Sequence, residues 1–132
     1  MDEKRLKSIP LFASLSRSER RQVASRADEV DLSEGKALVT EGEFAYEFFV
    51  IEEGTAEVVR GGKQIARLGP GDFLGEMGVI SRGKRNASVV AQSPMKVIVM
   101  TARDLRHIDE EMPAVARQIR DAIAARSEVL TE

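Results

Sequence analysis

An acid and an arginine stand close together in the segment from Gly69 to Ala91, which reads GPGDFLGEMGVISRGKRNASVVA. Glu76 comes directly after Gly75, and Arg85 ends a short basic loop. A carboxylate accepts hydrogen bonds from hydroxyls, and a guanidinium donates charge-assisted bonds to anionic oxygens. The two residues therefore suit a small ligand that carries both hydroxyls and a negative charge. A salt bridge between Glu76 and Arg85 is the alternative, and the rest of the chain has to decide between them.

The residues between this acid and the basic loop could complete a phosphate site. Met77 to Ile80 is about one helical turn, and N–H groups at the start of a helix bind phosphate. Gly75 has no Cβ and lets a ligand approach the backbone, although it could also be an ordinary turn glycine. A phosphate would repel Glu76, so a ribose hydroxyl is its natural partner. The pattern describes a ribose phosphate, and neither a Rossmann glycine pattern nor a P-loop is present.

Composition excludes several other functions. The chain has 132 residues, 42% of them apolar, and a net charge of -2, which gives no electrostatic footprint for nucleic acid. It has no cysteine and one histidine, so neither a thiolate nor a histidine-based metal site is expected, and no nucleophile–base pair indicates an enzyme. Its apolar runs are too short to cross a bilayer, and no signal peptide is recognisable. We expect a cytoplasmic protein without nucleic-acid or membrane partners.

The glycines divide the chain into helical ends and a middle of short strands. All ten lie between Gly35 and Gly83. We expect helices over 3–9 and about 17–28, the second started by a capping box of Ser16 and Glu19. Its arginines are expected to form a solvated face, a partner surface being the alternative. Seven or eight strands with hairpin turns follow, and they indicate a compact barrel or jelly roll.

Two turns and two later helices have clear sequence signals. Gly61-Gly62 predicts a hairpin, and Pro70-Gly71 fits the centre of a type II turn. Thr101 can cap a short helix, and Pro113 suits the first turn of the last one. Apolar residues recur along that last helix at three- and four-residue steps, which places them on one face: Val115, Ile119, Ala122, Ile123 and Leu130.

The central segment resembles the phosphate-binding cassette of cyclic nucleotide-binding domains, which are found in catabolite-activator-type transcription factors, kinase regulatory subunits and cyclic-nucleotide-gated channels. The family pattern, roughly F-G-E-[LIM]-[AGC]-L and then R-[TS]-A-[ST]-V, stands here as Leu74-Gly75-Glu76-Met77-Gly78-Val79 and Arg85-Asn86-Ala87-Ser88-Val89. The likeness extends over nearly the whole chain, from Ile9-Pro10-Leu11-Phe12 through the turn at Gly69-Pro70-Gly71-Asp72.

The resemblance implies a fold. We expect an α+β, mainly β protein: an eight-stranded β-roll or jelly roll (double-stranded β-helix) with N-terminal helices, a short phosphate-binding helix and C-terminal lid helices. One domain would span 1–132. Its N-terminal helices would occupy 1–28, the roll 29–101 with the cassette at 73–89, and the hinge and lid helices 102–132.

The resemblance also implies ligand contacts. Glu76 would bind the ribose 2′-hydroxyl and Arg85 the cyclic phosphate. Backbone groups at Gly75, Met77, Gly78 and Ala87 would complete the phosphate cradle. Asn86 departs from the family, which has threonine or serine there, and we take this as favouring cAMP, with cGMP as the alternative ligand.

The base side of the pocket is expected from the roll and the last helix. Leu68, Leu74 and Val89 would form the wall. By resemblance to channel-type members, Arg126 would stack over the purine and Leu130 would cap it. Arg126 also interrupts the apolar face of its helix, and an arginine that snorkels to solvent is the alternative reading.

These expectations describe a cyclic nucleotide sensor, most simply for cAMP, that signals by moving its C-terminal helices toward an effector in cis or in trans. It would have no catalytic residue, no metal and no cofactor. The alternative is a degenerate roll that binds no nucleotide and serves as a protein-interaction module, since Asn86 replaces a hydroxyl residue.

Overall fold

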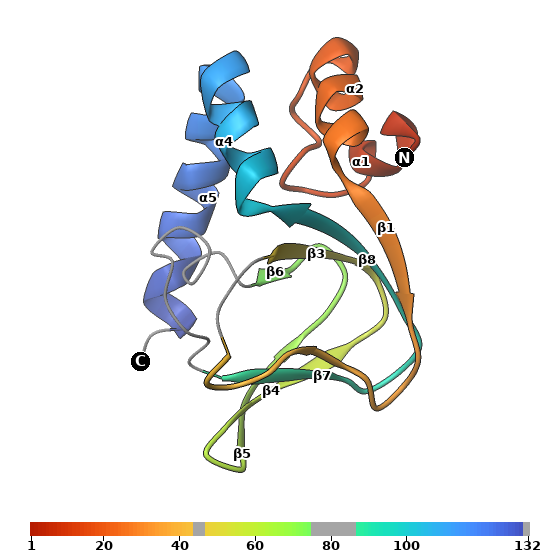
Figure 1. The fold of residues 1–132 in the computed structure, drawn as a ribbon, viewed down its shortest axis with the longest axis vertical. Coiled ribbons are helices and arrows are strands. Elements are labelled where there is room, and N and C mark those ends of the chain that lie inside the picture. The colour runs from red at the N-terminus through yellow and green to blue at the C-terminus, as the bar shows by residue number, and fades with distance from the viewer. Residues whose placement is uncertain (44–46, 75–86, 131–132) are drawn as a thin grey trace.

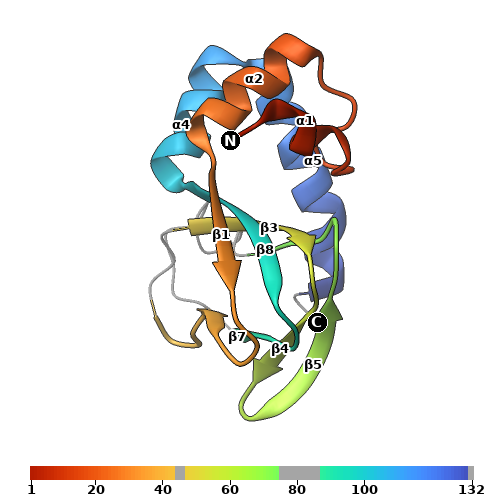
Figure 2. The same cartoon turned by 90° about the vertical axis from the view of Figure 1, so that its right-hand side faces the viewer.

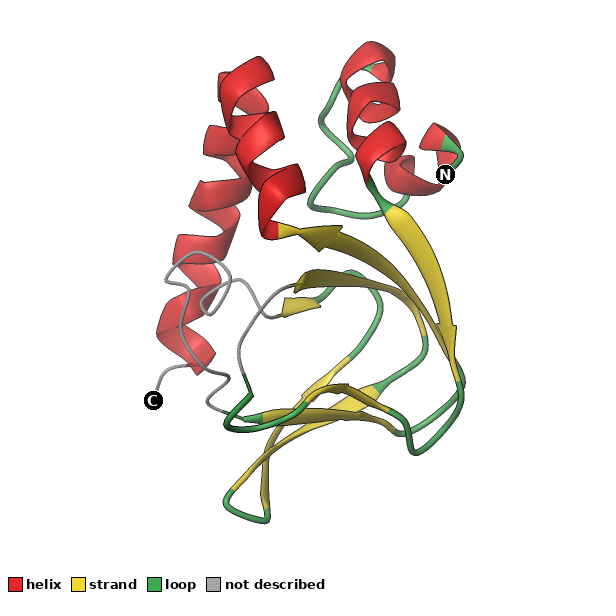
Figure 3. Ribbon diagram, in the orientation of Figure 1, coloured by secondary structure: helices red, strands yellow, loops and turns green. Residues whose placement is uncertain are grey.

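The computed structural model describes residues 1–43, 47–74 and 87–130, with side chains up to residue 121. Figure 1 shows a layer of helices on one side of a roll made from two sheets, and Figure 3 separates the two kinds of element by colour. The predicted α+β, mainly β architecture is confirmed.

Eight antiparallel strands form two sheets of four. The first has the order β1-β8-β3-β6 and the second the order β2-β7-β4-β5. Apart from the β4–β5 hairpin, consecutive strands alternate between the two sheets, so the chain winds as a roll. The strands are β1 (Asp28–Leu32), β2 (Ala37–Val39), β3 (Glu47–Glu53), β4 (Ala56–Arg60), β5 (Lys63–Leu68), β6 (Phe73–Leu74), β7 (Ser88–Ala91) and β8 (Met95–Thr101).

The central strands of the first sheet, β3 and β8, are buried on both faces. On β3, Phe48 and Val50 join an outer apolar cluster beneath the helices, whereas Phe49 and Ile51 join an inner cluster between the sheets. Strand β8 divides in the same way. Side chains of a strand alternate between its faces, so a continuous apolar run such as FFVI predicts a strand covered on both sides. This sheet is the common wall of the helical layer and the roll interior.

Four helices cover the outer face of that sheet: α1 (Glu3–Lys7), α2 (Arg17–Arg26), α4 (Ala102–Glu111) and α5 (Pro113–Leu130). The Ser16 hydroxyl accepts from the Glu19 N–H while the Glu19 carboxylate accepts from the Ser16 N–H, which confirms the capping box. Thr101 and Asp104 form a second box at α4. Pro113 begins α5, as the sequence predicted.

Helix α2 is shorter than the predicted 17–28. Ala27 is already extended, with φ -102° and ψ 145°, and Asp28 pairs with Val99 of β8. Strand pairing therefore ends the helix at Arg26, and the roll begins one residue earlier than the sequence indicated. The arginines of α2 are not uniformly solvated either. The Arg20 side chain is only 11% exposed, because it donates to the Glu3 carboxylate and the Leu15 carbonyl.

Both predicted turns are present. Gly61 and Gly62 have φ values of 57° and 79°, as a two-residue hairpin turn with two positive φ angles requires. Gly71 has φ 89°, and the Asp72 N–H donates to the Gly69 carbonyl at 3.0 Å, which closes a type II turn around Pro70. That turn directly precedes the candidate site.

Candidate functional site

The chain enters the candidate site through a turn that is fastened to β3. The Gly71 N–H donates to the Ile51 carbonyl and the Ile51 N–H to the Asp72 carbonyl, both at 2.8 Å. The Asp72 carboxylate accepts from the Gly69 N–H at 2.8 Å. These bonds hold the start of the cassette against β3, so its first residues have a defined register with that strand.

Strand β6 is only two residues long, and its two side chains face opposite ways. Leu74 lies opposite Phe49 in the register and belongs to the inner cluster. Phe73 lies opposite Val50 and belongs to the outer cluster, where its ring lies 5.9 Å from that of Phe48. The cassette therefore begins with one side chain in the roll interior and one among the helices.

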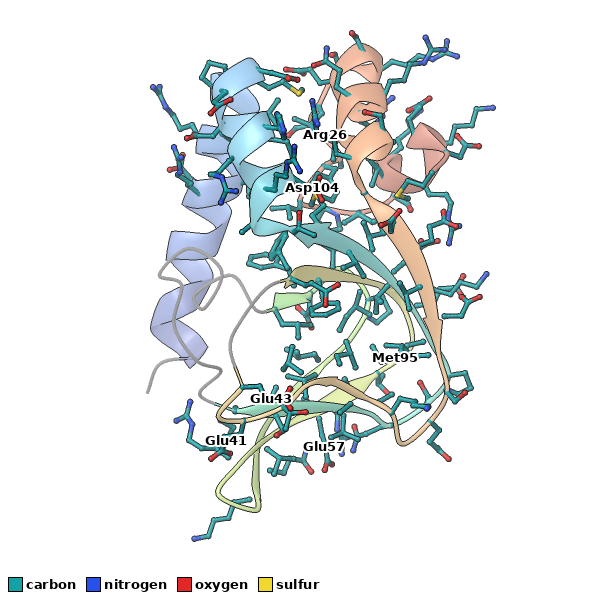
Figure 4. The ribbon with its side chains drawn as sticks, viewed as in Figure 1. Arg26, Glu41, Glu43, Glu57, Met95 and Asp104 are labelled. Carbon is teal, nitrogen blue, oxygen red and sulfur yellow. The ribbon has the colours of Figure 1, made fainter. Side chains whose placement is uncertain are left out.

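The chain leaves the site into the other sheet. Ala87 is buried, and β7 then pairs with both β2 and β4. The Ser88 hydroxyl accepts from the Glu41 N–H at 2.8 Å, and the Glu41 carboxylate accepts from the Gly61 N–H at 3.0 Å. Glu41, labelled in Figure 4, thus joins the end of the cassette to the β4–β5 hairpin.

The structure brings together the three residues predicted for the wall of the roll, and Ala87 of the predicted cradle joins them. Leu68, Leu74, Ala87 and Val89 are each at most 7% exposed and belong to the inner cluster. Leu74 comes from one sheet and Leu68 and Val89 from the other, so the cluster lines the interior from two sides. An apolar surface of this kind can accept the flat face of a base or the carbons of a sugar.

The remaining predicted contacts lie outside what the structure describes. Gly75, Glu76, Met77, Gly78, Arg85 and Asn86 are outside the described residues, as is the predicted short phosphate-binding helix. Arg126 and Leu130 lie on α5, whose helical backbone is described there but whose side chains are not. Their roles stay predictions.

The C-terminal helices rest on the outer cluster that contains Phe73. Ile108 of α4 and Met112, between the two helices, join it, as do Val115 and Ile119 of α5. Polar contacts tie the same helices to the N-terminal ones. Arg26 donates to the two Glu111 carboxylate oxygens at 2.9 and 3.0 Å, across α2 and α4, and Gln118 bonds Ser14.

An arginine that the sequence did not single out fastens α1 to the roll. Arg5 donates through Nε and Nη2 to the Glu52 carboxylate at 2.7–3.0 Å and also pairs with Glu29. The hydrogen bond to Glu52 raises the pKa of the Arg5 guanidinium above its ordinary value, so the group stays charged. No short-range pattern reveals this contact, because 47 residues separate the partners.

The described residues show neither a metal centre nor a membrane span. Among them, no three acidic or histidine side chains lie close enough together to hold a metal ion. Within the same part of the chain, no helix is both long and apolar enough to cross a membrane. What the described part does present is a buried apolar interior at both ends of the cassette.

The two sheets and the helical layer define a β-roll with a helical cover. The Cyclic nucleotide-binding domain family matches residues 29–111, and the chain belongs to this family.

The curated relatives that match the chain are much longer proteins, of which it covers only a part. The chain is 34% identical over 110 residues to a cAMP-dependent protein kinase regulatory subunit from Mycosarcoma maydis, covering 76% of this chain and 21% of the relative. It is 31% identical over 123 residues to a putative potassium channel protein from Rhodopseudomonas palustris, covering 90% of this chain and 30% of the relative. The chain thus spans less than a third of these relatives.

Solved structures share the fold. The catabolite activator protein of Thermus thermophilus superposes with a TM-score of 0.81 at 26% identity, over 92% of this chain and 59% of that one. A putative cyclic nucleotide-binding protein from Geobacter metallireducens superposes with a TM-score of 0.84 at 22% identity, over 98% of this chain and 97% of that one. At 22% identity, the likeness to the Geobacter metallireducens protein shows a shared fold and nothing further.

Proposed function

We propose that this domain binds cAMP in the interior of the roll and reports its binding through the C-terminal helices. The observation that carries the proposal is the convergence of Leu68, Leu74, Ala87 and Val89 in one buried cluster at the two ends of the cassette. A ligand held by the intervening segment would lie against this wall. The family match favours such a domain over a roll that binds no nucleotide.

The polar half of the site is assigned to the cassette. Arg85 neutralises the cyclic phosphate, and the Glu76 carboxylate accepts a hydrogen bond from the ribose 2′-hydroxyl. Backbone N–H groups at Gly75, Met77 and Gly78 add further donors to the phosphate. Asn86 keeps both a donor and an acceptor where the family has a hydroxyl.

The choice of cAMP rests on Asn86 and on the relatives. Three kinase regulatory subunits among the relatives are named as cAMP-dependent. A structural neighbour from Trypanosoma brucei is described instead as the regulatory subunit of a cAMP-independent kinase, so the fold alone does not determine the ligand. The domain would act as a binding module rather than an enzyme, with a protein effector in cis or in trans.

The route to the helices runs through β6. Leu74 faces the proposed ligand, and its neighbour Phe73 packs in the cluster that carries α4 and α5. A ligand that repositions the cassette would therefore move a side chain on which the C-terminal helices rest. Arg126 and Leu130 of α5 would cover the base. The ligand favours this arrangement only as far as it binds it more tightly than the open one.

Calorimetry with cAMP, cGMP and 5′-AMP tests the proposal. A charge-assisted hydrogen bond contributes about 1.5–3 kcal/mol, so Arg85→Ala should weaken cAMP binding roughly ten- to a hundredfold. Arg82→Ala, in the same basic loop, is the matched control and should bind as the wild type does. Equal cAMP affinity of the Arg85 variant and the wild type would refute the phosphate assignment. If none of the three nucleotides binds, the proposed function is refuted.

A further inference from the structure

Two edge strands of the roll carry complementary charges around an exposed apolar residue. Strand β1 ends one sheet and reads DEVDL, and β5 ends the other and reads KQIARL. Among the described side chains, only Val30 on β1 and Ile65 on β5 are large, apolar and exposed, at 38% and 44%. An edge strand also presents unpaired backbone N–H and C=O groups to its surroundings.

We propose that these two strands are the two halves of a self-association surface, on which β1 of one copy pairs with β5 of the next. The strands are five and six residues long, whereas the other edge strands, β2 and β6, have only three and two. Figures 1 and 2 show the β4–β5 hairpin projecting from the end of the roll away from the helices, with β1 on a separate side of the molecule. One copy could therefore use both strands at once.

The register supports this pairing. In an antiparallel arrangement with Val30 opposite Ile65, Asp28 lies opposite Arg67 on the same face. Leu32 then lies opposite Lys63, whose stem can cover it. Asp28, Lys63 and Arg67 have no ion-pair partner among the described residues, so the new pair breaks none that the structure shows there.

Symmetric pairing is disfavoured by the same charges. If β1 paired with β1 about Val30, Glu29 would lie opposite Asp31 twice. If β5 paired with β5 about Ile65, Lys63 would lie opposite Arg67 twice. Like charges directly opposite each other destabilise a strand pair. The partner of β1 is therefore β5 of another copy, and such a head-to-tail contact builds rings or open chains rather than symmetric dimers.

Sedimentation velocity of the full chain tests the proposal. The sedimentation coefficient of the wild type should rise with concentration up to the submillimolar range, and added salt should weaken the association. Asp28→Arg and Arg67→Glu each place like charges opposite each other and should weaken self-association by about tenfold or more. Mixing the two variants should restore it. The arginine introduced on β1 of one variant then meets the glutamate introduced on β5 of the other, and the native pair re-forms in the second contact.

Matched controls separate this contact from a general effect of net charge. Glu110→Arg and Arg106→Glu make the same charge changes at exposed positions of α4 and should associate as the wild type does. Ile65→Lys provides a second lesion of β5, and circular dichroism shows whether each variant is folded. A monomeric wild type at every concentration would overturn the proposal. So would unchanged association of the single variants, or a mixture that associates no better than its components.

Discussion

Gly54 lies in the turn between β3 and β4, where the backbone passes very close to the start of β8. Its φ is 93°, and a Cβ built there would lie 2.4 Å from the Pro94 carbonyl oxygen and 2.9 Å from the Met95 Cα. Both obstacles are backbone atoms, which move only together with their strand. Met95 is the first residue of β8 and belongs to the inner cluster. A side chain at Gly54 would therefore displace the start of β8 and disturb the packing of the roll interior.

Gly35 is a matched control for that position. Its φ is 90°, and a Cβ there would meet nothing within 4 Å. In both variants, alanine at a positive φ costs about 1–2 kcal/mol, and the loss of chain entropy in the unfolded state offsets part of this cost equally. The backbone overlap at Gly54 adds about 1–3 kcal/mol. These shared terms cancel in the comparison, so the free energy of unfolding should fall by about 1–3 kcal/mol more in Gly54→Ala than in Gly35→Ala.

Urea denaturation of the wild type and both variants measures this difference. The m-values should remain similar, so the midpoints report stability directly. Equal losses in the two variants would refute the close approach of the β3–β4 turn to the start of β8. A larger loss at Gly35 would refute it more strongly.

Three further changes test other contacts. Glu52→Gln should lower the free energy of unfolding by about 1–2 kcal/mol in denaturant titrations, because the partly buried Arg5 guanidinium loses one of its two charged partners, whereas the exposed Glu53→Gln should change it by under about 0.5 kcal/mol. That guanidinium has a raised pKa, so its stabilisation persists from neutral to moderately alkaline pH, and a loss over that range would contradict the pairing. Thr101→Ala removes the N-cap of α4 and should lower the free energy of unfolding by about 1 kcal/mol. Thr40→Ala is the control, because Thr40 is exposed and caps no helix; equal melting temperatures of the two variants would count against the cap. Phe73→Leu should leave cAMP affinity within about threefold, since Phe73 lies outside the roll interior. The variant should, however, reduce the protection from hydrogen exchange that bound cAMP gives α4 and α5. Undiminished protection would argue against the route through β6.

The elements that local chemistry specifies could be predicted from the sequence. The capping box at Ser16, the Gly61-Gly62 hairpin and the turn at Pro70-Gly71 each depend on a few adjacent residues, and each is present. The two-sided burial of β3 also follows from its continuous apolar run. The positions proposed for the pocket wall came from the family resemblance, because periodicity alone does not single them out.

The contacts between distant segments could not be predicted in this way. The bonds from Glu41 to Ser88 and Gly61 join positions far apart in the chain, and only the roll brings them together. The early end of α2 at Arg26 depends on the pairing of Asp28 with Val99, which helix propensity does not contain.

The opposite faces of β6 were likewise hidden in the sequence. Phe73 and Leu74 read as one apolar pair, yet each joins a different core cluster. This division depends on the pairing of β6 with β3, and it connects the proposed pocket to the helical layer.

An NMR titration of the isotope-labelled domain with cAMP tests the central claim most directly. We expect saturable shifts of the Gly75, Gly78 and Ala87 amides and of the Leu74 and Val89 methyl groups. The amide of Lys63, at the hairpin end of β5, should keep its position. Amide and methyl signals of the cassette and wall that stay unchanged at saturating cAMP, or shifts confined to residues outside the roll interior, would contradict the account.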